Sequence, residues 1–313
     1  MILDEDAQEV WDATRAEMRW PLHVLGVAAG RAFSVESEHI GPDLESVVDT
    51  IASTPLGTKI SVRIYRPISS VSHLPVLLYI HGGGWSIGSV AGTDDLCREL
   101  AARADCVVVS VDYRQAPEFP FPAPLDDCWT ALRWLVDSSA DLRIDPSRVA
   151  VGGDSAGGNL AAALALKARD ADGPPLVLQL LVYPATESEP TARSRSEHAF
   201  APILTAADVE WFWSLYLPDR QDRVDHLAVP ARAQRLDRLP ETVVLVADVD
   251  PIRDDGLTYA RALTDAGVPT TVRTYSGVYH GFFTMVGALA KTNLAIDDAS
   301  GFLRRAFGTE IEQ

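Results

Sequence analysis

The sequence predicts an α/β fold in which helices cover both faces of a mostly parallel sheet. Strand-like runs of β-branched residues alternate with amphipathic helical stretches through the middle of the chain, which is typical of such folds. These runs are short and almost continuously apolar, as expected for strands buried on both faces. The 313 residues, 47% of them hydrophobic, suffice for two domains or for one large α/β unit with an insertion.

Strands and helices can be assigned in order along the chain. The expected strands are residues 59–67, 75–81, 106–113, 148–153, 176–184, 241–248 and 270–276. Between and after them lie segments of about the length that a crossover between parallel strands needs. The expected helices are residues 94–102, 124–137, 156–169, 254–266 and 294–307.

Two segments interrupt this alternation. Residues 1–45 are patterned as helices and precede the first expected strand. Residues 187–222 insert a second helical piece, for which Thr205 is a suitable N-cap. We expect these two segments to pack together as a helical cap over one α/β domain, formed by residues 46–186 and 223–313.

The composition excludes several classes of partner. The chain has 27 Lys and Arg against 44 Asp and Glu, a net charge of −17, and such a surface repels nucleic-acid backbones and anionic membranes. The first residues lack the pattern of a signal peptide and no apolar run could span a bilayer, so we expect a cytoplasmic protein. Cys97, Cys106 and Cys128 lack metal-binding spacing and are expected to be buried free thiols.

A glycine-flanked serine is the first candidate for chemistry. Gly153-Asp154-Ser155-Ala156-Gly157 follows an expected strand and opens an expected helix. In this context G-x-S-x-G forms a sharp turn that exposes a nucleophilic serine, and small neighbours are needed because the turn is crowded. The five residues alone could also serve phosphate binding or packing, but their position between strand and helix favours Ser155 as a nucleophile.

A serine nucleophile needs a base to accept its proton and a carboxylate to orient that base. Both partners should follow the serine in sequence, at the carboxyl ends of later strands. His280 fits because it lies on a loop just after the last expected strand. His226 also lies downstream, but its polar surroundings favour a place on the surface.

Four aspartates compete for the role of the carboxylate. Asp254 and Asp255 lie at the start of an expected helix, where negative charge is favourable without any catalytic role. Asp250 could itself cap that helix, with proline following it. The residues alone therefore leave Asp248 and Asp250 open as the catalytic acid.

A glycine run offers donors for an oxyanion. His81-Gly82-Gly83-Gly84-Trp85 follows an expected strand, and glycines expose their backbone N–H groups. In acyl transfer such groups stabilise the negative charge that develops on the carbonyl oxygen. We expect an oxyanion hole formed by Gly82, Gly83 and Gly84 together with the N–H of Ala156, which follows the serine.

Five ordered blocks resemble a known family. They are HGGGW (81–85), VDYRQAPE (111–118), GDSAGGNLA (153–161), DVDPIRDDG (248–256) and YHGF (279–282). Together they are similar to the hormone-sensitive-lipase-like, or bacterial family IV, group of α/β-hydrolase carboxylesterases, over nearly the whole chain. One departure is Gln115, where the family usually has an apolar residue, and this position is not catalytic.

The resemblance implies a fold, an activity and a catalytic acid. It implies an α/β-hydrolase fold with a helical cap, and a Ser155, His280, Asp250 triad, since the family's acid directly precedes the proline. It implies hydrolysis of small carboxylic esters with short to medium acyl chains, without metal or cofactor, by a monomer or homodimer. Because the base must be neutral, activity should fall at acidic pH.

Aromatic residues in and near the cap are candidates for an apolar substrate pocket, although each could instead pack in the core. The candidates are Trp85, Trp211, Phe212, Trp213 and Tyr216. Two alternatives remain. An amidase, lactonase or deacetylase would use the same triad, and a non-catalytic ligand receptor on this fold is expected to lack the histidine.

Overall fold

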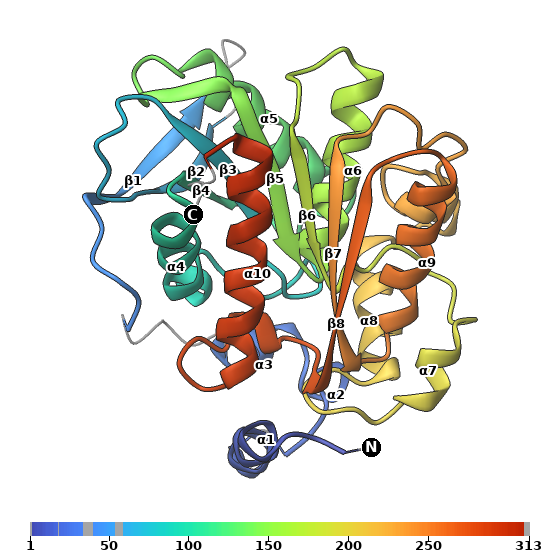
Figure 1. Cartoon of the computed structure of the whole chain (residues 1–313). Helices are drawn as coiled ribbons and strands as arrows, with labels where there is room; N and C mark the ends of the chain where they lie inside the picture. The colour runs from blue at the N-terminus through green and yellow to red at the C-terminus, as the bar shows by residue number, and fades with distance from the viewer. Residues whose placement is uncertain (1, 18, 34–39, 54–58, 310–313) are drawn as a thin grey trace.

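The computed structural model describes residues 2–17, 19–33, 40–53 and 59–309, which form one twisted sheet with helices on both sides (Figure 1). The sheet has eight strands in the order β1-β2-β4-β3-β5-β6-β7-β8. The strands are β1 (Ser46–Ser53), β2 (Lys59–Arg66), β3 (Leu74–Ile80), β4 (Val107–Asp112), β5 (Ile144–Asp154), β6 (Leu178–Val182), β7 (Glu241–Val249) and β8 (Thr270–Tyr279). β1, β2 and β4 pair antiparallel, and β4 through β8 are parallel to their neighbours. The predicted mostly parallel sheet is confirmed.

Helices cover the sheet because its central strands alternate apolar side chains between two faces. The helices are α1 (Glu5–Glu17), α2 (Leu22–Leu25), α3 (Val27–Phe33), α4 (Asp94–Ala104), α5 (Ala123–Asp137), α6 (Ala156–Asp170), α7 (Arg193–Glu197), α8 (Ala206–Tyr216), α9 (Arg253–Asp265) and α10 (Ala290–Phe307). Val76, Leu78 and Ile80 of β3 share one core with α5, α6 and α9. Leu77 and Tyr79 share the other core with α4 and α10, which lie in front of the sheet in Figure 1. In the described part of the chain, no helix has the length and hydrophobicity needed to cross a bilayer.

The expected strands and helices are all present, with ends shifted by a few residues. The strand missing from the sequence prediction is β1, whose sequence SVVDTIAS contains no continuous apolar run. β1 lies at the edge of the sheet, and its Val48 and Ile51 are about half exposed. A strand that buries so little apolar surface gives no strong hydrophobic pattern. The three cysteines are buried and free, as predicted.

The two segments predicted to form a cap contain α1 to α3 and α7 to α8. Thr205 caps α8 as expected, because its hydroxyl accepts the Asp208 N–H while the Asp208 carboxylate accepts the Thr205 N–H. Asp208 also accepts the N–H of His23 on α2 at 2.8 Å, which joins the two segments. The α1 helix lies elsewhere, against β8, where Asp4 N–H donates to Gly277 O. The division into cap and α/β domain stays a prediction, and residues 34–39 lie outside the described residues.

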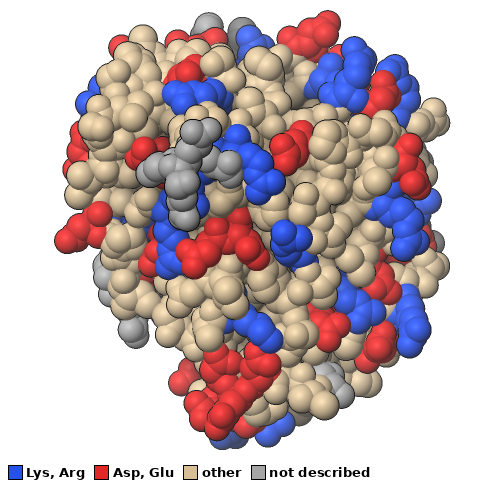
Figure 2. All heavy atoms as spheres, viewed as in Figure 1, with Lys and Arg blue, Asp and Glu red and all other residues tan. Residues whose placement is uncertain are grey.

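The surface carries charges of both signs. On the face shown in Figure 2, Lys and Arg are interspersed with Asp and Glu, and acidic side chains gather over α1 at the lower end. The α1 sequence, EDAQEVWDATRAE, accounts for this acidic patch. The cavity described below is lined mainly by apolar residues instead of charged ones.

Candidate active site

The turn between β5 and α6, residues 153–157, is called the nucleophile turn here. Ser155 at its centre has φ 57° and ψ −118°, a backbone conformation that non-glycine residues rarely adopt. A methyl group added to Gly157 or to Gly153 would overlap the backbone oxygen of Ile80 on the neighbouring strand. The turn can therefore form only with glycine at both outer positions, and it presents the Ser155 side chain beyond the end of the sheet.

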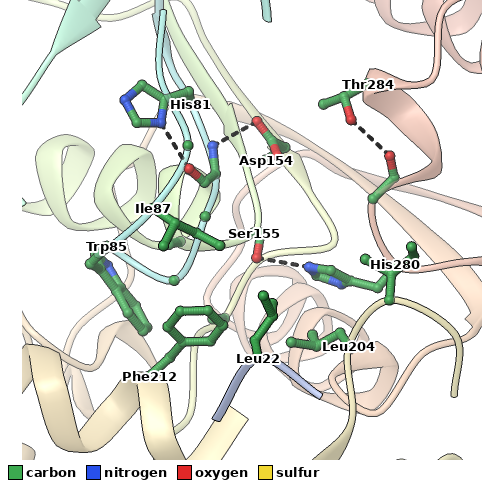
Figure 3. A pocket seen from close by; sticks show the side chains of 18 of the residues that line it. Leu22, His81, Trp85, Ile87, Asp154, Ser155, Leu204, Phe212, His280 and Thr284 are labelled. Carbon is green, nitrogen blue, oxygen red and sulfur yellow. Dashed lines mark hydrogen bonds between the residues drawn. The ribbon is translucent and has the colours of Figure 1, made fainter. Parts of the chain in front are cut away.

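Three predicted side chains meet at this turn. His280 Nε2 lies 2.8 Å from Ser155 Oγ (Figure 3), and His280 Nδ1 lies 2.7 Å from Asp250 Oδ2. His280 and Asp250 are both buried. A carboxylate can only accept, so Nδ1 carries the proton and Nε2 is left to accept the serine hydroxyl. The three residues follow β5, β7 and β8, whose carboxyl ends share one edge of the sheet.

The competing aspartates have other partners. The side chain of Asp248 is 46% exposed and lies 3.5 Å from Arg253. Asp254 accepts the Ser194 N–H, and Asp255 pairs with Arg195 at 2.9 Å. The alternative role of Asp250 as a helix cap is not realised, because α9 begins only at Arg253. Its Oδ1 instead accepts the Ile252 N–H at 2.8 Å.

The glycine run after β3 lies beside the nucleophile turn, but its first N–H points elsewhere. The Gly82 N–H donates to Asp154 Oδ1 at 3.0 Å, and the Tyr79 hydroxyl donates to the same oxygen at 2.7 Å. Gly82 therefore drops out of the predicted set of oxyanion donors. The N–H groups of Gly83, Gly84 and Ala156 donate to no acceptor within the part of the chain that the structure describes.

Asp154 is a site residue that the sequence reasoning missed. It directly precedes the serine, is buried, and links the nucleophile turn to the glycine run through Gly82. Burial raises the pKa of Asp154, and the hydrogen bonds from Tyr79 and Gly82 oppose that shift. The signal for it was a carboxylate at the buried end of an apolar strand, since such a group needs partners.

The glycine run is supported by side chains from several directions. His81 is buried, stacks on the Tyr113 ring at 4.4 Å, and its Nδ1 lies 2.8 Å from Gly82 O. Burial lowers the pKa of His81 to about 4, so this ring stays neutral at neutral pH and donates through Nδ1. The Gln115 amide donates to Gly88 O at 2.9 Å, so the residue that departs from the family pattern contacts the end of this loop.

A cavity of about 320 Å³ opens onto Ser155 and His280. The predicted Trp85 and Phe212 line it (Figure 3), as does the predicted Trp213, with further apolar residues that the sequence analysis did not select. These are Leu22, Phe33, Ile87, Ala185, Ile203, Leu204, Val209 and Ile252. Leu22 and Phe33 come from the N-terminal helices, where apolar residues at helical spacing do not distinguish a pocket from a core contact.

Two of the predicted pocket residues lie outside this lining. Tyr216 is fully buried and stacks on Trp85 with ring centroids 4.4 Å apart, so it supports the pocket wall from behind. Trp211 packs on Phe212 at 4.8 Å. Both residues therefore pack behind side chains that line the cavity and do not reach it themselves. His226, with its side chain 43% exposed, lies at the surface as expected.

Comparisons with known proteins identify the family and the fold. A family model described as alpha/beta hydrolase fold matches residues 77–284. Carboxylesterase NlhH of Mycobacterium tuberculosis is 46% identical over 72% of this chain and 72% of that protein. Esterase LipI of the same species is 42% identical over 80% of this chain and 78% of that protein. The structure of LAE6, an α/β hydrolase enzyme from the metagenome of Lake Arreo in Spain, has a TM-score of 0.91 at 37% identity, covering 98% of this chain and 99% of that one.

Proposed function

Since the chain belongs to the α/β-hydrolase fold family and, within it, to the hormone-sensitive-lipase-like carboxylic ester hydrolases, we propose that Ser155 is the nucleophile of a serine carboxylesterase. The observation that carries this proposal is the imidazole of His280, which bridges Ser155 Oγ at 2.8 Å and Asp250 Oδ2 at 2.7 Å. These contacts supply the base and the orienting carboxylate that a serine nucleophile requires.

The reaction proceeds through an acyl-enzyme. Ser155 Oγ attacks the ester carbonyl carbon while its proton moves to His280 Nε2, and the resulting imidazolium is stabilised by Asp250. When the tetrahedral intermediate collapses, the bond from the carbonyl carbon to the alcohol oxygen breaks and His280 returns the proton to that oxygen. Water then enters, His280 takes its proton, and the carboxylic acid leaves as Ser155 recovers its hydrogen.

The negative charge on the carbonyl oxygen needs donors that are already in place. We assign this role to the N–H groups of Gly83, Gly84 and Ala156, which have no acceptor within the described residues. Removing one such donor costs about 2.7–4 kcal/mol in other acyl-transfer enzymes. The hydrogen bond between Gly82 and Asp154 supports this arrangement because it fixes the start of the glycine run relative to the nucleophile turn.

The cavity supports small, apolar esters. At about 320 Å³ it lies at the lower end of the range for small-molecule sites, about 300–1,000 Å³. Its wall is built mainly of Leu, Ile, Val, Phe and Trp side chains, which favour an alkyl chain over a charged group. We therefore propose carboxylic esters with short to medium acyl chains as the substrate class.

The test is an assay of wild type and Ser155→Ala on p-nitrophenyl esters from acetate to palmitate. We expect a maximum at acyl chains of about four to eight carbons, which is what the resemblance to the carboxylesterase family implies and what a small apolar cavity can hold. The alanine variant should lose a factor of about 10⁶ in kcat. Undiminished hydrolysis by that variant would remove Ser155 from the mechanism. A matching series of p-nitroanilides measures whether the same site prefers amides, which would redirect the proposal to an amidase.

A further inference from the structure

The loop that carries Asp250, residues 250–255, is called the acid loop here, and its own hydrogen bonds fix only part of it. Asp250 Oδ1 accepts the Ile252 N–H at 2.8 Å, and Asp250 O accepts the Arg253 N–H at 3.1 Å. The carbonyl of Pro251, next to the acid, points out of this turn toward another part of the chain. The path of the backbone next to Asp250 is therefore fixed in part by what binds the acid loop from outside.

That outside partner is α7, which belongs to the segment predicted as cap. The hydroxyl of Ser194 donates to Pro251 O at 2.9 Å and accepts the Asp254 N–H at 3.2 Å. The Ser194 N–H donates to the Asp254 carboxylate at 2.9 Å. One buried serine thus bonds the acid loop both near its start, at Pro251, and near its end, at Asp254.

Arg195 adds a charged contact at the far end of the same loop. Its guanidinium is 4% exposed and donates to Asp255 Oδ2 at 2.9 Å and to Glu187 O at 3.1 Å. Burial raises the pKa of Asp255 to about 7, and Arg195 opposes this shift. Without Arg195 the Asp255 carboxyl would keep its proton or place a second uncompensated negative charge near Asp250, whose own charge raises that pKa further.

We propose that Ser194 and Arg195, the α7 pair, are positioning residues for catalysis, because they fix the acid loop so that the Asp250 carboxylate faces His280 Nδ1. This inference rests on the proposed function, since it takes Asp250 as the catalytic acid. It also gives α7 a task different from that of α8, whose Val209, Phe212 and Trp213 line the cavity. The α7 pair touches neither the cavity nor Ser155. Arg195 also lies 3.8 Å from Glu210 on α8, so Ser194→Ala, whose hydroxyl bonds only the acid loop within the described chain, is the variant whose effect should pass through that loop alone.

The test compares Ser194→Ala and Arg195→Ala with two matched controls on the same helix. Ser196→Ala removes an exposed hydroxyl that bonds only Arg193 O within the described chain, and Arg193→Ala removes a guanidinium whose side chain is 83% exposed. We expect kcat to fall about tenfold for Ser194→Ala and up to about a hundredfold for Arg195→Ala, as for other small displacements of catalytic groups. KM should stay within about twofold, both controls should match wild type, and Arg195→Lys should restore part of kcat.

A second readout separates positioning from general damage. In a protein that already carries Asp250→Asn, adding Ser194→Ala or Arg195→Ala should change kcat much less than in wild type, because the carboxylate that the pair positions is already gone. The low-field proton resonance of His280 Nδ1–H should shift in Ser194→Ala and stay unchanged in Ser196→Ala. If Arg195→Ala does not fold, Ser194→Ala and Arg195→Lys decide the question.

Several results would overturn the inference. They are a folded Ser194→Ala with wild-type kcat, an effect confined to KM, or an equal loss of kcat in the Asp250→Asn background. The failure of the proposed function looks different, since then Asp250→Asn or Ser155→Ala would itself retain activity. In that case the α7 pair loses its role together with the triad.

Discussion

The nucleophile turn and the acid loop hold two members of the proposed triad by different means. Ser155 is positioned by backbone packing, because Gly153 and Gly157 let the turn approach the Ile80 carbonyl. The Asp250 carboxylate accepts the Ile252 N–H, and side chains on α7, more than fifty residues earlier in the chain, bond its loop neighbours Pro251 and Asp255, which we propose positions the acid. A side chain held by local backbone packing is marked by a sequence pattern, here the two glycines within two residues of Ser155. Contacts from a distant helix cannot be read from the residues around Asp250.

After the loss expected for Ser155→Ala, the next largest expected effect is on the acid loop. Asp250→Asn keeps the shape of the side chain but lets the amide favour the wrong histidine tautomer, so kcat should fall about 10⁴-fold. Asp248→Asn is the matched control, because that carboxylate is 46% exposed and lies near Arg253. Steady-state kinetics on a short p-nitrophenyl ester measures both. A crippled Asp248→Asn beside an active Asp250→Asn would reverse the assignment of the acid.

The nucleophile turn should respond to a methyl group. In Gly157→Ala the new Cβ would overlap the Ile80 carbonyl oxygen, so we expect a loss of at least about 3 kcal/mol in the free energy of unfolding, with loss of activity. The control is Gly301→Ala in the middle of α10, where the nearest atom to a new Cβ is the Arg304 side chain at 3.9 Å. That change should stabilise the protein by up to about 1 kcal/mol, through helix propensity. Denaturant unfolding measures the free energy of unfolding of the two variants. Equal values for Gly157→Ala and Gly301→Ala would contradict the steric explanation.

This contrast also explains how far the sequence could be read. The central strands were predictable because burial on both faces demands continuous apolar runs, while β1 was missed because Val48 and Ile51 remain half exposed at an edge. Ser155 and His280 were predictable because each lies directly after a strand in a recognisable context. The choice between Asp248 and Asp250 could not be made from the residues alone, since both lie near the end of β7 and side-chain direction decides between them, and only the family resemblance pointed to Asp250.

Other parts of the site could not be predicted for a similar reason. The α7 pair and the pocket residue Leu22 act over long sequence distances, so no local spacing marks them. Gly82 belonged to the right motif, but only the Asp154 hydrogen bond shows that its N–H points away from the predicted oxyanion position. Trp211 and Tyr216 belonged to the right helix and face other partners.

Acidic pH should lower the stability of the folded protein through His81, which supports the glycine run beside the nucleophile turn. Burial lowers the pKa of His81 to about 4, whereas a histidine in the unfolded chain has a pKa of about 6.5. Between these two pH values the unfolded chain therefore binds a proton at His81 that the folded chain does not bind. Stability should therefore be lost as the pH falls from about 6.5 to about 4, by about 3 kcal/mol for this group. His81→Asn keeps a donor for Gly82 O and removes the titration. Urea unfolding at several pH values measures this loss in wild type and in His81→Asn. The same dependence of the unfolding free energy on pH in both proteins would contradict the prediction.

The smallest expected effect concerns the pocket wall that α8 supplies. Phe212 packs against Gly84 in the glycine run and lines the cavity, so Phe212→Ala should enlarge the space next to Ser155. We expect the ratio of kcat/KM for a long acyl chain to that for a short one to rise about tenfold. Trp211→Ala is the matched control, because Trp211 packs behind Phe212 and does not line the cavity. Equal chain-length profiles for both variants would remove Phe212 as a determinant of substrate size.

The most direct measurement of the central claim is covalent labelling with a p-nitrophenyl alkylphosphonate. Ser155 Oγ should form a bond to phosphorus while p-nitrophenolate leaves, with the serine proton passing to His280. We predict one p-nitrophenolate released per chain, a mass adduct on the peptide that contains Ser155, and no labelling of Ser155→Ala. An adduct on another residue, or full esterase activity in the labelled protein, would contradict the account.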